Sequence, residues 1–228
     1  MVFGFDYYLE SALDTAARSS RTAKGGKVDT TFSGAKGKPQ GIISDPEEMK
    51  RVVFQNIREC VGILYDQREA DYTPGSFKTL VEVIAERASR GTIAPRPTVY
   101  RTHEIDLGKG YGCPVAEIPK FMDMFSLFGS VVYNVRIPNE HGLVVLQAIL
   151  EKTLDKDIHP FADACGRTAK LITLGLAMRN GMSMRVSPEI QKRYDTMGPV
   201  SRDINMFSPE SARGLVQYLS QQEIFVKK

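Results

Sequence analysis

A chain of 228 residues with 42% apolar and 25% charged side chains has the composition of a globular protein built around one large domain. Its formal net charge of +3 is too small to indicate nucleic acid as a partner. Three widely separated cysteines form no CxxC pair, so they predict neither a disulfide framework nor a zinc site and are typical of a reducing compartment. No apolar run reaches the ~18 residues that a membrane-spanning helix needs, and no basic residue precedes the first apolar stretch. We therefore expect neither a membrane span nor a conventional secretory signal.

The first 43 residues predict an extension that precedes a main domain over 44–228. The extension begins with a short amphipathic helix expected over residues 3–16, in which apolar side chains share one side: Phe5, Leu9 and Leu13. Residues 17–41 carry six Lys or Arg against one Asp, and Gly, Ser and Thr fill most of the remainder. Such a segment buries little apolar surface. It is interpreted as a solvated tail, with an export signal or a contact with an acidic partner as the sharper interpretation.

Signals for helices begin abruptly at residue 44. Ser44-Asp45-Pro46-Glu47-Glu48 combines a capping side chain, a proline at the first helical position and acids in the first turn. Apolar residues then recur at helical spacing as far as Leu64. Further helices are expected over about 76–89, after Pro119, over about 139–155, over about 167–181, and after the Ser-Pro-Glu sequences at 187–189 and 208–210.

One part of the chain favours strands instead. Residues 98–102 (Thr-Val-Tyr-Arg-Thr) are β-like and Gly108-Lys109-Gly110 forms a turn sequence, so a β-hairpin is predicted over about 98–112. The predicted fold class is therefore mostly α, a helical domain with one β-hairpin flap.

The run from His159 to Thr168 (HPFADACGRT) places several chemical groups between two predicted helices. His159 lies where a helix passes into a loop, and its imidazole can accept a hydroxyl proton near neutral pH. Gly166 permits a turn, and the free N–H groups of the helix that begins near Arg167 form an anion site. Asp163 would repel a bare phosphate there unless it holds Mg²⁺, and Arg167 offers two parallel donors to a terminal phosphate.

These residues resemble the Fic motif, whose usual form is His-Pro-Phe-x-Asp/Glu-Gly-Asn-Gly-Arg, commonly with a second Arg three residues later. The resemblance extends over roughly 75–195. Tyr100-Arg101 resembles the strand before the Fic target-docking flap, Ile118-Pro119 the start of the helix after it, and 171–181 the helix after the motif.

The resemblance implies a helical protein that transfers AMP from ATP to a Ser, Thr or Tyr hydroxyl of another protein, while some relatives use other nucleotides, move phosphocholine or phosphorylate. By the family's pattern His159 would be the general base, Asp163 would hold Mg²⁺, and Arg167 would bind the distal phosphate. The remaining contacts to the nucleotide would come from Ala164, Cys165, Gly166 and Lys170. The flap over 98–112 would pair with an extended segment of the target, and Phe161 would be buried.

Three positions depart from the motif. Ala164 replaces the usual Gly, a mild change unless the backbone there is left-handed. Cys165 replaces an Asn whose amide can donate to the α-phosphate, and losing one such donor typically costs ~100- to 1,000-fold in rate. Lys170 replaces the second Arg and keeps the charge without the planar fork. No Ser/Thr-x-x-x-Glu-Gly/Asn inhibitory motif is found in the sequence.

Each residue also has a plainer interpretation. Asp163 could cap the following helix, Arg167 and Lys170 could be surface residues, and Cys165 could fill a loop. His103 and His141 are expected to be exposed or capping residues.

The leading hypothesis is a Fic-type transferase that uses Mg-ATP and acts either in the cytoplasm or after export from a bacterium into another cell. One rival is a Fic-fold module that binds a nucleotide or a protein without catalysis. The other is an enzyme with a different donor, such as NAD or a CDP-alcohol.

Overall fold

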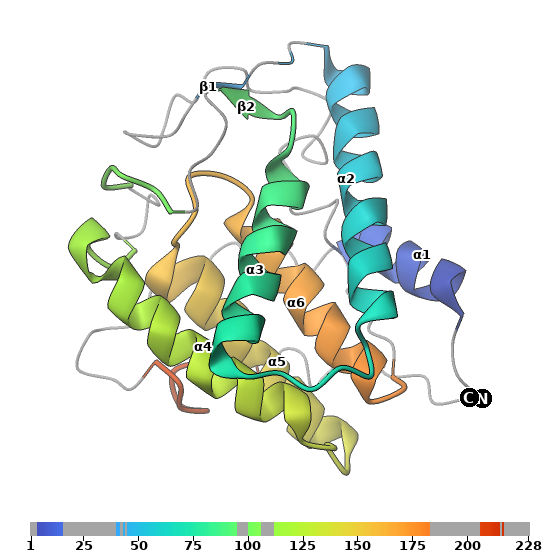
Figure 1. Cartoon of the computed structure of the whole chain (residues 1–228), viewed down its shortest axis with the longest axis vertical. Coiled ribbons are helices and arrows are strands. Elements are labelled where there is room, and N and C mark those ends of the chain that lie inside the picture. Colours follow the sequence, from blue (N-terminus) through green and yellow to red (C-terminus); the bar gives the residue numbers. More distant parts are fainter. Residues whose placement is uncertain are drawn as a thin grey trace.

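The computed structural model describes residues 4–15, 40–41, 43, 45–94, 100–105, 112–182, 206–214 and 216. Within these ranges the chain is mostly helical (Figure 1). The α-helices are α1 (Phe5–Thr15), α2 (Pro46–Asp66), α3 (Pro74–Ser89), α4 (Ile118–Asn134), α5 (Glu140–Lys152) and α6 (Cys165–Arg179). The shorter elements are the antiparallel pair β1 (Gln40–Gly41) and β2 (Ile93–Ala94), the 3-10 helix η2 (Val115–Glu117) and the π-helix η3 (Thr153–Ile158).

Local capping sets several of the helix starts. The side chain of Asp45 accepts from the N–H of Glu47 at 3.0 Å and starts α2, which confirms the start predicted from the sequence. Thr73 and Ser76 form a reciprocal capping box at the start of α3. The side chain of Asn139 accepts from the N–H of Gly142 at 2.7 Å and starts α5. These caps satisfy N–H groups that have no partner inside the helix.

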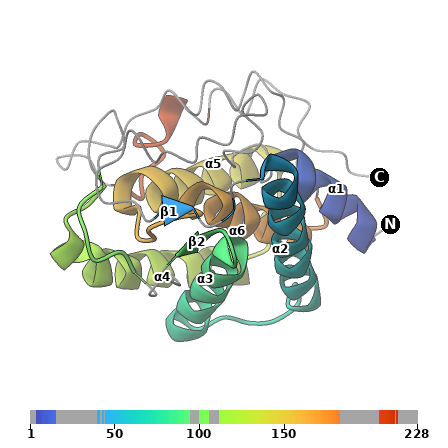
Figure 2. The same cartoon turned by 90° about the horizontal axis from the view of Figure 1, so that it is seen from above.

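Helix α6 lies in the middle of the bundle and contacts α1, α2, α3 and α5 (Figures 1 and 2). Every residue from Arg167 to Met178 is buried, so this helix has no solvent-facing side over that stretch. Polar side chains on it must therefore find partners within the protein. Because α6 directly follows the His159 loop, the core of the domain fixes one end of the candidate site.

The helix expected over 139–155 exists, but its last part has a different winding. Helix α5 continues into η3, and η3 ends at His159. π-turns of this kind occur mostly as short insertions and often at functional sites. The change of winding sets where the imidazole leaves the helix.

Some expected elements differ or lie outside the description. The β-hairpin predicted over 98–112 is not shown, because residues 100–105 form no strand and 95–99 and 106–111 are outside the described residues. The segment 17–39 and the start at 187–189 are outside as well. After the predicted start at Ser208, residues 206–212 form turns, in which the Ser208 hydroxyl accepts from the N–H of Ser211 at 3.2 Å, and residues 213, 214 and 216 are helical. None of the helices in the described ranges has the length and apolarity to cross a membrane.

Candidate functional site

His159 is held in one orientation by the π-turn that precedes it. Its Nδ1 lies 2.6 Å from the carbonyl oxygen of Asp155, and its backbone N–H donates to the carbonyl of Leu154 at 3.1 Å. A carbonyl oxygen can only accept, so in the neutral ring Nδ1 carries the hydrogen and Nε2 carries the lone pair. This is the tautomer that a general base needs at Nε2. The residue is 7% exposed.

The loop after His159 begins and ends with a left-handed backbone. His159 has φ 46° and ψ 59°, and Ala164 has φ 64° and ψ 11°. In the described part of the chain these are the two non-glycine residues with positive φ. Left-handed conformations cost roughly 1–2 kcal/mol for residues with a side chain, and such strain gathers at functional sites. The motif's glycine position is therefore left-handed, and the replacement by Ala164 has a conformational cost.

Cys165 closes the loop from inside. Its Sγ accepts from the N–H of Phe161 at 3.3 Å and donates to the carbonyl of Phe161 at 3.2 Å. The thiol is 2% exposed and Phe161 is 4% exposed. A thiol that satisfies both backbone groups of one residue holds the loop against the first turn of α6. The geometry thus gives Cys165 a packing and hydrogen-bonding role.

Asp163 and Arg167 bind each other. Nη2 of Arg167 lies 2.8 Å from Oδ2 of Asp163, and the same oxygen accepts from the hydroxyl of Thr92 at 3.2 Å. Nη1 of Arg167 donates to the carbonyl of Ala88 at 2.8 Å. Arg167 is 6% exposed. Its guanidinium therefore joins the loop after His159 to the end of α3. A terminal phosphate would have to exchange with the Asp163 carboxylate to reach it.

Lys170 forms a second internal ion pair. Its Nζ lies 2.6 Å from Oε1 of Glu151 on α5, and both side chains are 4% exposed. The pair connects α5 with α6 in the core. Lys170 could contact a phosphate only if its ion pair with Glu151 were broken.

A carboxylate also lies over the first turn of α6. A Cβ on Gly166 would lie 3.3 Å from Oδ1 of Asp155, and Oδ2 of Asp155 is 3.1 Å from Nζ of Lys156. The N-terminal end of a helix favours negative charge. The position predicted for a phosphate beside Gly166 thus adjoins a carboxylate of the protein itself.

The described residues do not build a resident metal site. No group of three or more His, Cys, Asp or Glu side chains within these ranges is arranged to hold a metal ion. Asp163 offers a single carboxylate, which already binds Arg167 and Thr92. One carboxylate can contribute to Mg²⁺ binding only together with substrate phosphates and water.

From the sequence, Arg101 was only part of the Tyr100-Arg101 strand that resembles the one before the Fic flap, whereas the structure places it against the candidate site. Its Nε donates to the carbonyl of His159 at 2.7 Å, Nη1 to the carbonyl of His103 at 3.0 Å, and Nη2 to the carbonyl of Cys113. Its own N–H donates to the carbonyl of Pro160 at 2.8 Å. The residue is 4% exposed. Arg101 therefore joins both ends of the predicted flap to the loop that carries the imidazole, which a lone arginine in a β-like stretch does not reveal.

Comparison with protein-family models, with curated proteins and with solved structures finds no match to this chain. The resemblance to the Fic family therefore depends on the motif residues and their neighbours alone.

Proposed function

We propose that the protein is a Fic-type transferase that moves AMP, or a related phosphate-containing group, from a nucleotide to a hydroxyl of another protein. The observation that carries the proposal is the His159 imidazole, whose Nδ1–H donates to the Asp155 carbonyl and leaves the lone pair on Nε2. A positioned base of this kind typically contributes ~100- to 10,000-fold in rate. The left-handed backbone on both sides of the loop supports the same proposal.

The residues divide the work as follows. His159 accepts the proton of the target hydroxyl as that oxygen attacks the α-phosphorus, and the nucleotide's remaining phosphates leave. The N–H groups at the start of α6 stabilise the developing charge. Arg167 and Lys170 are the proposed partners of the distal phosphates. Asp163 is the proposed protein ligand for the Mg²⁺ that accompanies ATP.

Donor binding must then exchange internal carboxylates for phosphates. Arg167 is paired with Asp163, and Lys170 is paired with Glu151. A triphosphate carries enough charge to compete for both cations, but it first has to open one partly buried contact and one buried contact. We therefore expect slow transfer, and faster transfer once Glu151 is neutralised.

The test is the mass added to a target protein. We would incubate the full chain with a mixture of candidate proteins and Mg-ATP, NAD or CDP-choline separately, and record intact and peptide masses. A mass gain equal to AMP that vanishes with His159→Ala supports the proposal. His141→Ala is the matched control, because His141 is an exposed histidine in the first turn of α5. AMP transfer that survives in His159→Ala would refute it.

A second candidate function is a Fic-fold module that binds without catalysis. The internal pairing of Arg167 and Lys170 favours it, because both predicted phosphate ligands already have carboxylate partners. Saturable binding of a nucleotide without transfer from any donor would identify this function. The different-donor hypothesis predicts a mass gain with NAD or CDP-choline instead. Efficient AMP transfer by a Cys165→Asn variant alone would show that the native chain has departed from that activity.

We also propose where the protein acts. It acts either in the cytoplasm of the cell that produces it or, after export from a bacterium, in the cytoplasm of another cell. The target would dock on the segment over 98–112.

A further inference from the structure

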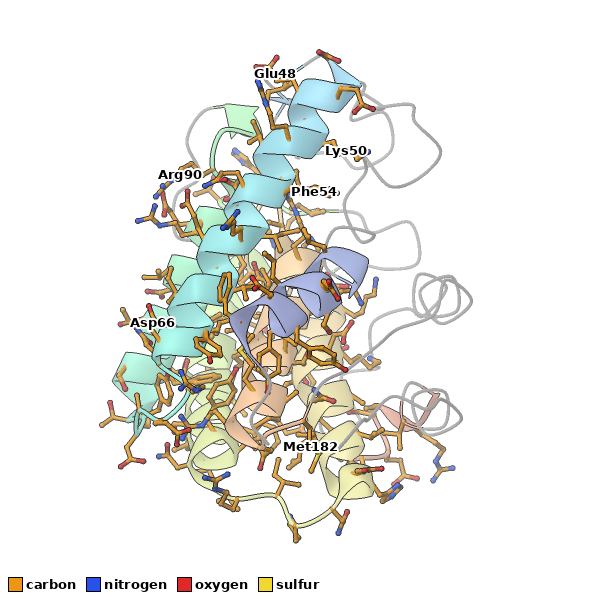
Figure 3. All side chains as sticks on the ribbon, turned by 90° about the vertical axis from the view of Figure 1, so that its right-hand side faces the viewer. Glu48, Lys50, Phe54, Asp66, Arg90 and Met182 are labelled. Atoms are coloured by element: carbon orange, nitrogen blue, oxygen red, sulfur yellow. The ribbon has the colours of Figure 1, made fainter. Side chains whose placement is uncertain are left out.

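A groove of about 450 Å³ lies between α1 and the N-terminal half of α2, and it shares no residue with the candidate site. Figure 3 shows α1 crossing α2, with Lys50 and Phe54 on the same side of α2, between that crossing and the N-terminal end of α2. The lining combines apolar side chains from both helices with basic side chains from α2.

Apolar side chains from both helices form part of the groove wall. Leu9 and Leu13 are one turn apart on α1 and only partly buried. Phe54, on α2, is 37% exposed. The ammonium of Lys50 lies 5.9 Å from the centroid of the Phe54 ring. Apolar surface that is gathered in a concave site and edged by charge is typical of an interaction surface.

The charged part has an excess of cations. Lys50, Arg51 and Arg58 line the groove against the single acid Glu47. Glu47 is 4.0 Å from Lys50 and both side chains are largely exposed, so that pair neutralises little. Arg51 and Arg58 make no ion pair with any residue in the described ranges. Among the residues that the structure describes, two guanidinium groups without a carboxylate partner therefore lie at the edge of an apolar groove.

The spacing of Arg51 and Arg58 sets the distance between the negative charges that a ligand needs. They are seven positions apart on α2, which is about two helical turns and roughly 10.5 Å along the axis. Phe54 lies between them along the helix. A ligand that satisfies all three groups needs two negative charges separated by a similar distance, with apolar groups between them.

We propose that this groove docks an acidic amphipathic helix of a partner protein. Two carboxylates seven positions apart on that helix would face Arg51 and Arg58, and apolar side chains between them would contact Leu9, Leu13 and Phe54. This is the helix-in-groove mode of recognition, with anchors at helical spacing.

Charge and shape argue against two other occupants. The chain's own segment 17–41, which follows α1 along the chain, carries six Lys or Arg and one Asp, so the groove's cations repel it. A small molecule usually needs a site that encloses most of its surface, whereas the α2 residues lining this groove are exposed. An acidic surface on a partner protein has the charge that the groove's cations attract, and it is large enough to cover an open groove.

The test uses a synthetic, fluorescein-labelled, helix-forming peptide with two Glu seven positions apart and Leu side chains between them on the same face. Fluorescence anisotropy with the full chain should show saturable binding that weakens as salt rises. The same peptide with Lys in place of both Glu should not bind. Arg51→Gln with Arg58→Gln should weaken binding about 10-fold, because two edge charges are lost. Phe54→Ser should weaken it independently of salt.

The matched control is Lys120→Gln with Arg213→Gln, which removes the same charge from exposed positions outside the groove. Circular dichroism checks that each variant folds. His159→Ala should bind the peptide as the native chain does, which separates this proposal from the transferase proposal.

Several results would overturn the proposal. One is equal binding of the Glu and Lys peptides, and another is an arginine double variant that behaves like its control. Arginine-dependent binding to anionic vesicles without peptide binding would assign the groove to a lipid surface. A dimer that is lost in Phe54→Ser would assign it to a second copy, and competition by a peptide of residues 17–41 would assign it to the chain itself.

Discussion

The ion pair between Lys170 and Glu151 gives the sharpest test of the structure. Both side chains are 4% exposed and their charged atoms are 2.6 Å apart, on adjacent helices of the core. In Lys170→Met, the Glu151 carboxylate keeps its desolvated position and loses its cation. Removing one member of a buried pair typically costs about 3–5 kcal/mol, because the other charge stays uncompensated. That is a large part of the roughly 5–15 kcal/mol that stabilises a domain of this kind.

The double variant should behave differently. Lys170→Met combined with Glu151→Leu removes both charges and fills the space with apolar atoms of similar volume. Such replacements are often neutral, or stabilising by about 1–4 kcal/mol. We therefore expect the double variant to unfold at a urea concentration close to that of the native chain, well above that of Lys170→Met.

The assay is urea denaturation followed by circular dichroism, analysed as a double-mutant cycle. Arg213→Met is the control, because its ion pair with Glu210 is 66% and 67% exposed and should contribute at most about 1 kcal/mol. A loss below about 1 kcal/mol in Lys170→Met would refute the buried pair. A double variant no more stable than Lys170→Met would refute the reasoning about desolvation.

Three further predictions use the same denaturation assay. Gly129→Ala should lower the free energy of unfolding by about 1–3 kcal/mol, because its Cβ would lie 2.1 Å from the buried ring of Phe77. Gly62→Ala, whose Cβ would have nothing within 4 Å, should raise the free energy of unfolding by up to about 1 kcal/mol. A Gly129→Ala variant more stable than Gly62→Ala would contradict the packing. Burial raises the pKa of the Cys60 thiol to about 12, whereas in the unfolded chain the thiol ionises near ~8.5. The native state keeps the thiol proton to higher pH than the unfolded chain does. The stability that comes from this difference is therefore fully present below pH ~8.5 and falls by about 1.4 kcal/mol per pH unit as the pH rises toward 12. Cys60→Ala should therefore flatten the pH dependence of the free energy of unfolding between pH ~8.5 and 10. An unchanged slope would argue against the raised pKa of Cys60. Asp45→Ala removes the side chain that caps α2 and should cost about 1 kcal/mol, whereas an unaffected midpoint would show that the cap contributes nothing.

Local chemistry was enough to predict much of the helical framework. Asp45-Pro46 starts α2 as predicted, and Asn180-Gly181 closes α6, with Gly181 at φ 64°. Caps and glycine turns act between residues a few positions apart, so their effect can be read without the fold. The hairpin over 98–112 is not shown, because residues 100–105 form no strand and 98–99 and 106–111 lie outside the described residues.

The partners of the candidate site were decided by the tertiary structure. The sequence places His159, Asp163 and Arg167 in one short run, and it could suggest that they act together. It could not show that Glu151, 19 positions earlier, holds Lys170, or that Thr92, 71 positions earlier, binds Asp163. A buried charge binds whichever opposite charge the packing of helices brings near, and that depends on how α3, α5 and α6 meet. The sequence by itself therefore determined which groups are present, and the packing around α6 decided which of them bind one another.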